Sequence, residues 1–584
     1  MTYTFGAVNR TNRFLAVGRI LWGAALALWL ARVYFLHPAE QSHRNHETNT
    51  YAGRLIEFRD VFAHGHLSPQ WCGHFRAGLG SPYFGYYQPG LFYAAALVPW
   101  QVPPLRALGV AVAGFAMLGY LGMLGLVGRR FGSLSGWLGA TALLASVYAG
   151  TEIYVRGDLS EFAAMMTLPA ALGALAGWLE AGRLRHAVCL ALAGGALIVL
   201  HPVVAMLGYG LMGLAIAAWV LTVVKKAGEP RGLPPRASGR RDATGGSWQR
   251  RAAGAAAALG AGVGLAAFYW MPVFFELDLV QSGRAFTDFY HYSHHFVDAR
   301  DLFRPYAREA TAIPLSLGFL PVLLAAVNAA VLVARRREAT APQRRLMVFA
   351  LGASAVLVFL MTPASAPIWA WLPPLQRLQF PWRMLSVVAV LVAAAAGAML
   401  PWRPQRVRAA LVALLAAALW GLSWQYTAYE LDADARVPDG VEQLATQDFA
   451  PDLRDEWLPR GAAANVPTAD RRGPISGPGC RVGDFQRGQG FLTCRLRAEG
   501  ASWVTLPHYD FPVGWQARLG GRPVPLGHDE RGLMRVEVPG GTDAVLEVTF
   551  SHTPMRRWGL VVSGVTLLAG IALATALARR RADP

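Results

Sequence analysis

Long apolar runs recur along most of this 584-residue chain, separated by short polar segments. A run of about 17 to 25 apolar residues is long enough to cross a bilayer as a helix. The first run is too long for a signal peptide and lacks a small-residue cleavage site, so we expect a membrane anchor there. The pattern predicts about twelve membrane-spanning helices, at residues 14–36, 105–127, 134–150, 161–180, 186–203, 205–224, 252–275, 313–334, 346–362, 384–400, 409–425 and 558–578.

A second pattern begins near Ala501, where apolar and polar residues alternate with the period of a β-strand. Gly520 and Gly521 separate two of these stretches, as in a tight hairpin turn. We therefore expect a small β-sandwich between the last two spans. The predicted fold class is a mainly α polytopic membrane protein with a small C-terminal β-sandwich-like domain outside the membrane.

These patterns predict three parts of the chain. Residues 1–425 form the predicted transmembrane domain, which includes a large first outer loop at 37–104. Residues 426–557 form the predicted β-rich domain outside the cytoplasm, and residues 558–584 form the last span with a basic cytoplasmic tail.

The distribution of charge agrees with this topology. The chain carries 54 Lys and Arg against 36 Asp and Glu, which gives a formal net charge of +18. The basic residues collect on alternate loops between the predicted spans, which is the positive-inside pattern of membrane proteins. This pattern places both termini in the cytoplasm and the β-rich domain on the periplasmic side of a bacterial inner membrane. The excess charge, as in the basic loop 225–251, then reports topology and contact with anionic membrane lipids, and no nucleic-acid partner is expected.

Two of the four cysteines, Cys480 and Cys494, lie in one strand-like stretch of the predicted β-rich domain. In an oxidising compartment they could form a disulfide that closes a short loop, worth about 3 kcal/mol. We expect that bridge. Cys72 and Cys189 have no evident partner in the sequence.

Two acidic motifs fall on the predicted outer side of the membrane. His46 and Glu47 lie in the loop after the first span, and RGDLSE (156–161) lies at the mouth of a later span. Ionised groups beside hydrocarbon are costly, so carboxylates at such places usually serve a substrate, an ion or a partner charge. These motifs are therefore the first candidates for a functional site.

The sequence segments around these motifs resemble those of a known protein family. The first outer loop reads HETNTYAGRLIEF (46–58), GHLSPQW (65–71) and GLGSPYFGYYQPGLFY (78–93). In this order, the segments resemble the first outer loop of bacterial membrane proteins of the 6-pyruvoyl-tetrahydropterin-synthase-related group, which look like polytopic glycosyltransferases of the GT-C superfamily. YVRGDLSEFAAM (154–165) and LQFPWRMLSVV (378–388) resemble later motifs of that group, and the C-terminal β-rich text resembles the outer domain of YfhO-type proteins.

The resemblance implies a GT-C-like integral membrane glycosyltransferase. Its donor would be a polyprenyl-phosphate-linked sugar, and its acceptor a glycan, lipid or protein of the cell envelope outside the cytoplasm. Glu47 takes the place of the acidic residue proposed as catalytic in that group, and Tyr51 replaces a histidine. That replacement removes a possible metal ligand or hydrogen-bonding partner.

The chemistry of sugar transfer suggests roles for the charged residues. The reaction needs a base for the acceptor's proton and cations for the phosphate leaving group. We expect Glu47 to be the base and Glu161 to be a second acidic group that orients the acceptor or a divalent metal ion. No Gly-rich nucleotide loop is found between a strand and a helix, which argues against a soluble sugar-nucleotide donor. The predicted substrate-binding residues, with arginines as phosphate clamps, are Arg54, Arg156, Asp158, His201, Arg377 and Arg383.

Each of these residues also has a plainer interpretation. Glu47 is otherwise a solvated loop residue, and Glu161 pairs with a neighbouring arginine only to close the mouth of a span. Asp158 is otherwise an interfacial carboxylate, and His201 caps or packs a helix. Arg383 is otherwise an interfacial anchor that extends its charged end to water.

Two other classes of protein fit the same patterns. One is a transporter or assembly factor for lipid-linked saccharides or cell-envelope polymer, with no bond-making step. It predicts charged residues buried along a path through the middle of the spans, and few are present. The other is a scaffold whose β-rich domain binds cell-wall polymer, for which about twelve spans are excessive.

Overall fold

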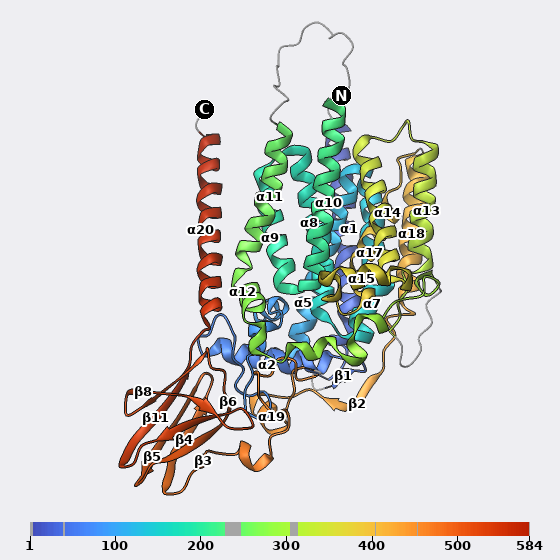
Figure 1. Cartoon of the computed structure of the whole chain (residues 1–584). Coiled ribbons are helices and arrows are strands. Elements are labelled where there is room, and N and C mark those ends of the chain that lie inside the picture. Colours follow the sequence, from blue (N-terminus) through green and yellow to red (C-terminus); the bar gives the residue numbers. More distant parts are fainter. Residues whose placement is uncertain are drawn as a thin grey trace.

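The computed structural model shows a bundle of long helices with a β-sheet region at one end (Figure 1). The start of α1 and the end of α20 lie at the opposite end of the bundle (Figure 1). The structure describes residues 4–38, 41–227, 247–303, 313–402, 404–452 and 454–582. Most of the basic loop 225–251 therefore lies outside the described residues.

Eight helices in the described part of the chain are long and apolar enough to cross a membrane, and one bent pair makes a ninth. This confirms a mainly helical, multi-pass membrane protein. The bent pair is α11 (Ser247–Leu265) and α12 (Ala267–Phe275), which meet at 73°. The other spanning segments are α1 (Thr4–Ala31), α5 (Pro104–Phe131), α6 (Ser133–Leu144) continued by α7 (Val147–Thr151) and the π-helical turn η2 (Glu152–Arg156), α8 (Leu159–Ala181), α10 (Pro202–Ala227), α14 (Ala341–Met361), α18 (Gln405–Ser423) and α20 (Pro554–Ala582).

Three further apolar helices are shorter, namely α9 (Leu184–Leu200), α13 (Phe319–Ala334) and α17 (Leu385–Gly397). Each of the twelve ranges expected from hydropathy overlaps one of these three helices or one of the spanning segments named above. Because the three shorter helices fall below the length of an ordinary span, the number of crossings stays a prediction.

Small residues let the central helices approach closely. Every residue of α17 is buried. A methyl group on Gly397 would come within 2.6 Å of the Gly139 backbone, so α17 and α6 touch backbone to backbone there. Membrane helices pack through small residues in this way because lipid gives no hydrophobic driving force between helices.

The β-sheet region contains a four-stranded sheet in the order β3-β6-β10-β9 and a five-stranded sheet in the order β4-β5-β11-β7-β8. Their apolar faces share one core, as expected for a sandwich. Gly520 and Gly521 form the turn between β7 and β8 with φ of +55° and +77°, which confirms the predicted hairpin. The strands are β3 (Ile475–Ser476), β4 (Cys480–Gly488), β5 (Phe491–Ala498), β6 (Ser502–Tyr509), β7 (Trp515–Leu519), β8 (Arg522–Val524), β9 (Gly527–His528), β10 (Leu533–Val538) and β11 (Thr542–Phe550).

The predicted disulfide is absent, because Cys480 and Cys494 are free and buried thiols. Cys480 pairs across the β4–β5 hairpin with Ala498, whereas Cys494 lies four residues before Ala498 in β5. At about 3.3 Å per residue this offset is about 13 Å, whereas a disulfide needs Cα atoms within about 7 Å. The register of the hairpin therefore rules out the bridge.

The first outer loop lies between the bundle and the β-sheet region. Its helices are α2 (Thr48–Ala63), α3 (Tyr83–Tyr86) and α4 (Gly90–Ala96). Trp71 of this loop packs in the core of the β-sheet region and donates a 2.9 Å hydrogen bond from Nε1 to His508 Nε2. Strand β1 (Gln41–His43) also pairs with β2 (Leu431–Arg436). The loop thus joins the two regions.

Candidate functional site

A cavity of about 1000 Å³ lies among the first outer loop, the starts of α8 and α10, and the segments 282–295, 377–383 and 454–457. Seven of the predicted site residues line it. They are Glu47, Arg54, Arg156, Asp158, His201, Arg377 and Arg383. The structure therefore gathers residues that are spread over more than 300 positions of the sequence.

The start of α8 is shaped by a turn that only glycine fits well. The π-helical turn η2 ends at Gly157, whose φ is +71°. A Cβ atom there would lie 2.9 Å from the Thr48 backbone nitrogen, so the glycine also lets the start of α2 approach. Asp158 then caps α8, because its Oδ1 accepts a 3.1 Å hydrogen bond from the Glu161 backbone N–H.

Arg156 is the centre of a buried charge cluster. Its guanidinium lies 2.5 Å from Glu152, 2.9 Å from Glu161 and 3.2 Å from Asp158. Arg383 adds a second cation, with Nε 3.4 Å from Glu161 Oε2. Buried charges must be paired to be tolerated, and here two guanidinium groups neutralise most of three carboxylates.

Glu161, predicted as the second acidic group of the site, does not reach the cavity. Its side chain is fully buried, bonded to Arg156 and to the Tyr148 hydroxyl, and it does not line the cavity. The contact with Arg156 matches the plainer interpretation of this residue. Glu161 therefore acts on the cavity only through the arginines that it holds.

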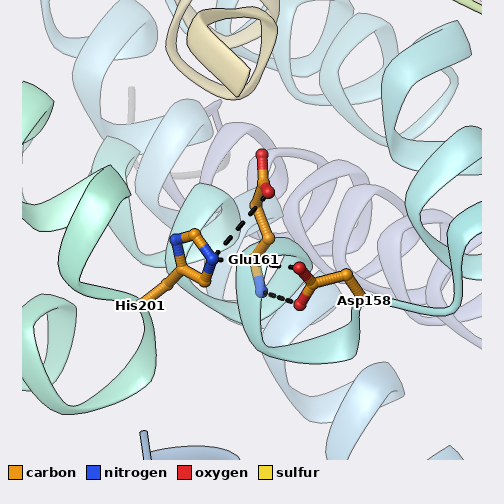
Figure 2. A group of neighbouring side chains, drawn as sticks. All are labelled: Asp158, Glu161 and His201. Carbon is orange, nitrogen blue, oxygen red and sulfur yellow. Dashed lines mark hydrogen bonds and ion pairs between the residues drawn. The ribbon is translucent and has the colours of Figure 1, made fainter. Parts of the chain in front are cut away.

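His201 lies at the junction of α9 and α10 and faces the same acidic pair. Its Nε2 is 3.8 Å from Asp158 Oδ2 and 3.9 Å from Glu161 Oε2. Figure 2 shows the imidazole turned toward the two carboxylate side chains.

The ligand atoms of this triad lie within 4.8 Å of one another, a spacing suited to a divalent ion. However, Arg156 already binds both carboxylates. A metal ion would have to displace or crowd that guanidinium, so the residues present fit an arginine better than a metal.

Glu47 lies at the edge of the cavity, just before α2. Its Oε2 accepts a 3.2 Å hydrogen bond from Arg54 Nη1, and its side chain is 21% exposed. Burial raises the pKa of Glu47 above its ordinary value, and Arg54 opposes that rise. Glu47 thus has the partial desolvation and the cationic neighbour that suit a proton acceptor.

Tyr51 belongs to a chain of hydrogen bonds that runs from Arg54, the partner of Glu47, to Asp158. Its hydroxyl donates a 2.9 Å hydrogen bond to Asp158 Oδ1 and accepts one of 2.9 Å from Tyr87. Tyr87 in turn accepts from Arg54 Nη1 at 3.0 Å. Tyr51 and Tyr87 therefore link the Glu47–Arg54 pair to Asp158 by hydrogen bonds.

The two arginines near α17 differ in how they are held. Arg383 donates from Nη1 to Gln379 Oε1 at 3.1 Å and lies over the Phe380 ring. Arg377 is exposed and lies over the Phe286 ring at 5.3 Å. Within the described part of the chain, Arg377 has no hydrogen bond or ion pair, so its charge is free for a ligand.

Sequence reasoning missed residues that come from a distant segment. Arg454, Glu456 and Trp457 also line the cavity. They lie in a polar, acidic stretch before the strands of the β-sheet region, and no local motif marks them.

Comparisons with known proteins give distant matches only. No family model matches the chain, and no curated protein matches it. Among solved structures, the chain is similar to the arabinofuranosyltransferase AftD from Mycobacteria (14% identity, 77% of this chain and 28% of that chain, TM-score 0.35). It is also similar to ArnT from Cupriavidus metallidurans bound to undecaprenyl phosphate (16%, 69% and 64%, TM-score 0.39).

A third similar structure is the oligosaccharyltransferase from Archaeoglobus fulgidus tethered with an acceptor peptide (14%, 76% and 60%, TM-score 0.41). The chain thus spans from about a quarter to under two thirds of these matched chains. Of these three structures, two are named as an arabinofuranosyltransferase and an oligosaccharyltransferase, and the third is bound to undecaprenyl phosphate. At these TM-scores the likeness decides nothing about activity, which has to be argued from the site itself.

Proposed function

We propose that this protein is an integral membrane glycosyltransferase of the GT-C type, with a polyprenyl-phosphate-linked sugar as donor and an acceptor outside the cytoplasm. The observation that carries the proposal is that Glu47, Arg156, Arg377 and Arg383 all line the same cavity. A partly buried carboxylate and several guanidinium groups are the proton acceptor and the phosphate clamps that this reaction needs.

In the proposed reaction, an acceptor hydroxyl oxygen attacks the anomeric carbon of the donor sugar. The new glycosidic bond forms as the bond from that carbon to the phosphate oxygen breaks, and configuration inverts. Glu47 takes the hydroxyl proton. The leaving group is the polyprenyl phosphate, which keeps the electron pair of the broken bond.

The arginines divide the work of holding that leaving group. Among the described residues, the Arg377 guanidinium has no hydrogen bond or ion pair. Arg383 uses Nη1 for Gln379 and the Leu378 carbonyl oxygen and pairs with Glu161 through Nε, so its Nη2 is left for a ligand. These two are the proposed phosphate clamps, because guanidinium binds phosphate through a planar fork of N–H donors. Arg156 is engaged by three carboxylates, so its proposed role is to set the charge and shape of the cavity floor.

Replacement of Glu47 by Gln tests this proposal. The amide keeps the size of the side chain but cannot accept the proton, so kcat for release of polyprenyl phosphate should fall at least about 100-fold. The measurement is release of polyprenyl phosphate from a polyprenyl-phosphate sugar by protein in lipid nanodiscs. E442Q, on the surface helix α19 (Val441–Thr446), is the matched control and should behave as the parent.

Unchanged activity in E47Q at equal expression would remove Glu47 from the mechanism. Transbilayer movement of the lipid-linked sugar, with no release of polyprenyl phosphate by the parent protein, would contradict the enzyme and favour a transporter.

A further inference from the structure

Arg454, Glu456 and Trp457 form part of the cavity wall. The described residues of this segment, 451–452 and 454–457, are held by several contacts. Arg54 donates from Nε to the Pro451 carbonyl oxygen at 2.8 Å. Arg76 forms ion pairs with Asp452 and Asp455. These contacts tie the segment to the first outer loop.

The same segment is also tied to the opposite wall. Arg454 lies 2.9 Å from Asp288 Oδ2 and donates to the Thr287 carbonyl oxygen at 3.2 Å. Its own charge is therefore already used. Residues 451–452 and 454–457, called the bridge below, are thus tied to the first outer loop through Arg76 and to residues 287–288 through Arg454.

Two side chains of this bridge are turned to the cavity. Glu456 accepts a 2.9 Å hydrogen bond on Oε2 from the Arg454 backbone N–H, and it lines the cavity. Trp457 stacks parallel to Tyr86, with ring centroids 6.0 Å apart, and both residues line the cavity. A carboxyl group thus lies beside an aromatic wall.

Hydrogen-bonding capacity assigns this wall to one substrate. Burial and the nearby Asp452 raise the pKa of Glu456 to about 7, and an acid, ionised or not, offers no cation to hold a lipid phosphate. An uncharged saccharide has hydroxyl groups that donate to a carboxylate and apolar C–H faces that pack on aromatic rings. Arg54 connects the surroundings of the two acids Glu47 and Glu456. It binds the Glu47 carboxylate, and it also binds the Pro451 carbonyl oxygen, five residues before Glu456.

We propose that Glu456 and Trp457 form the acceptor subsite, and that the acceptor presents an uncharged saccharide there. Glu456 accepts hydrogen bonds from sugar hydroxyls, and Trp457 with Tyr86 supports the sugar ring. The acceptor hydroxyl then reaches Glu47 from the side of the β-sheet region, while the donor phosphate occupies the arginine side. This inference rests on the proposed glycosyl transfer.

Transfer kinetics with E456Q and W457F test the subsite. The parent and both variants, in lipid nanodiscs, receive a polyprenyl-phosphate sugar and a panel of methyl hexopyranosides and methyl pentofuranosides as acceptors. We expect each variant to raise the acceptor KM about tenfold, while kcat at saturating acceptor changes less than twofold and the donor KM stays the same. E442Q is the matched control, with parental values throughout.

Each result that contradicts an expectation overturns a different part of the proposal. No release of polyprenyl phosphate by the parent under any condition overturns the proposed glycosyl transfer itself. Release by the parent without transfer to any glycoside overturns the uncharged saccharide acceptor. An unchanged acceptor KM in E456Q, or a raised donor KM, overturns the assignment of Glu456 to the acceptor side. A parental melting temperature for W457F ensures that its KM reports contact and not unfolding.

Discussion

At the scale of single residues, the site depends on hydrogen bonds between groups that are far apart in the sequence. Tyr51 contacts Asp158 at a separation of 107 positions, and Tyr87 contacts Tyr51 at 36. The acidic motifs at 46–47 and 156–161 were predictable, because carboxylates next to hydrocarbon are rare without a reason. Tyr87 and Glu456 gain their importance only through tertiary contacts, which no local pattern indicates. The motif around Tyr51 marked its position, but not its hydrogen bond to Asp158.

Tyr51→Phe removes one hydroxyl from this network. The Asp158 carboxylate loses a hydrogen bond, and such a bond to a charged group is worth about 1.5–3 kcal/mol. We expect kcat for polyprenyl phosphate release to fall about tenfold, with a lower melting temperature. Tyr120→Phe is the matched control, since its hydroxyl donates to the Arg19 carbonyl oxygen, away from the cavity. Equal activity losses in the two variants would refute a special role for Tyr51.

At the scale of elements, hydropathy predicted the helices well, because the bilayer sets both their length and their composition. The hairpin at Gly520 and Gly521 was predictable for a similar reason, since its geometry requires two residues with positive φ. Register was not predictable. The wrong disulfide between Cys480 and Cys494 shows this, because a strand pattern gives the alternation of side chains but not the partner across the hairpin.

The turn before α8 offers a test at this scale. Gly157→Ala places a Cβ at positive φ and within 2.9 Å of the Thr48 backbone, so the start of α2 and the adjacent Glu47 must shift. Gly182→Ala is the control, with φ of +62° and no atom closer than 3.6 Å. Both should lose about 1–3 kcal/mol of stability from the strained backbone. Only G157A should also lose activity, about tenfold or more, measured as polyprenyl phosphate release at a temperature where both variants are folded.

At the scale of the whole molecule, the β-sheet region is held to the bundle by polar contacts as well as by Trp71. Glu57 of α2 accepts hydrogen bonds from His74 Nδ1 and from Gln489 in the β4–β5 turn, both at 2.9 Å. Gln489 also donates to Asp60 Oδ2 at 2.9 Å. The junction is therefore a small acidic cluster closed by one histidine and one amide.

This junction should respond to pH. Burial alone would lower the pKa of His74, but Glu57 and Asp60 outweigh burial and Arg487, so its pKa lies above the ordinary 6.5. A raised pKa in the folded state means that protonation stabilises the junction. That stabilisation is complete below pH 6.5 and is lost as pH rises through the higher folded-state pKa.

Hydrogen exchange at the β4–β5 turn is the measurement for this junction, with rates corrected for intrinsic pH dependence. Opening at residues 488–490 should become several-fold more frequent from pH 6 to pH 9, and H74Q should remove most of that change. H528Q, in a surface strand of the β-sheet region, should keep it. The same pH profile in H74Q as in the parent would show that another group controls the contact.

The bond between Arg54 and the Pro451 carbonyl oxygen joins positions 397 residues apart. At roughly 5–20 residues per second, a ribosome needs roughly 20 to 80 seconds to make the intervening chain. During that interval the guanidinium beside Glu47 has no backbone anchor, and the bridge bearing Glu456 does not yet exist. The nascent chain is therefore inserted while this cavity lacks part of its wall, and the wall is complete only after nearly four fifths of the polypeptide has been made.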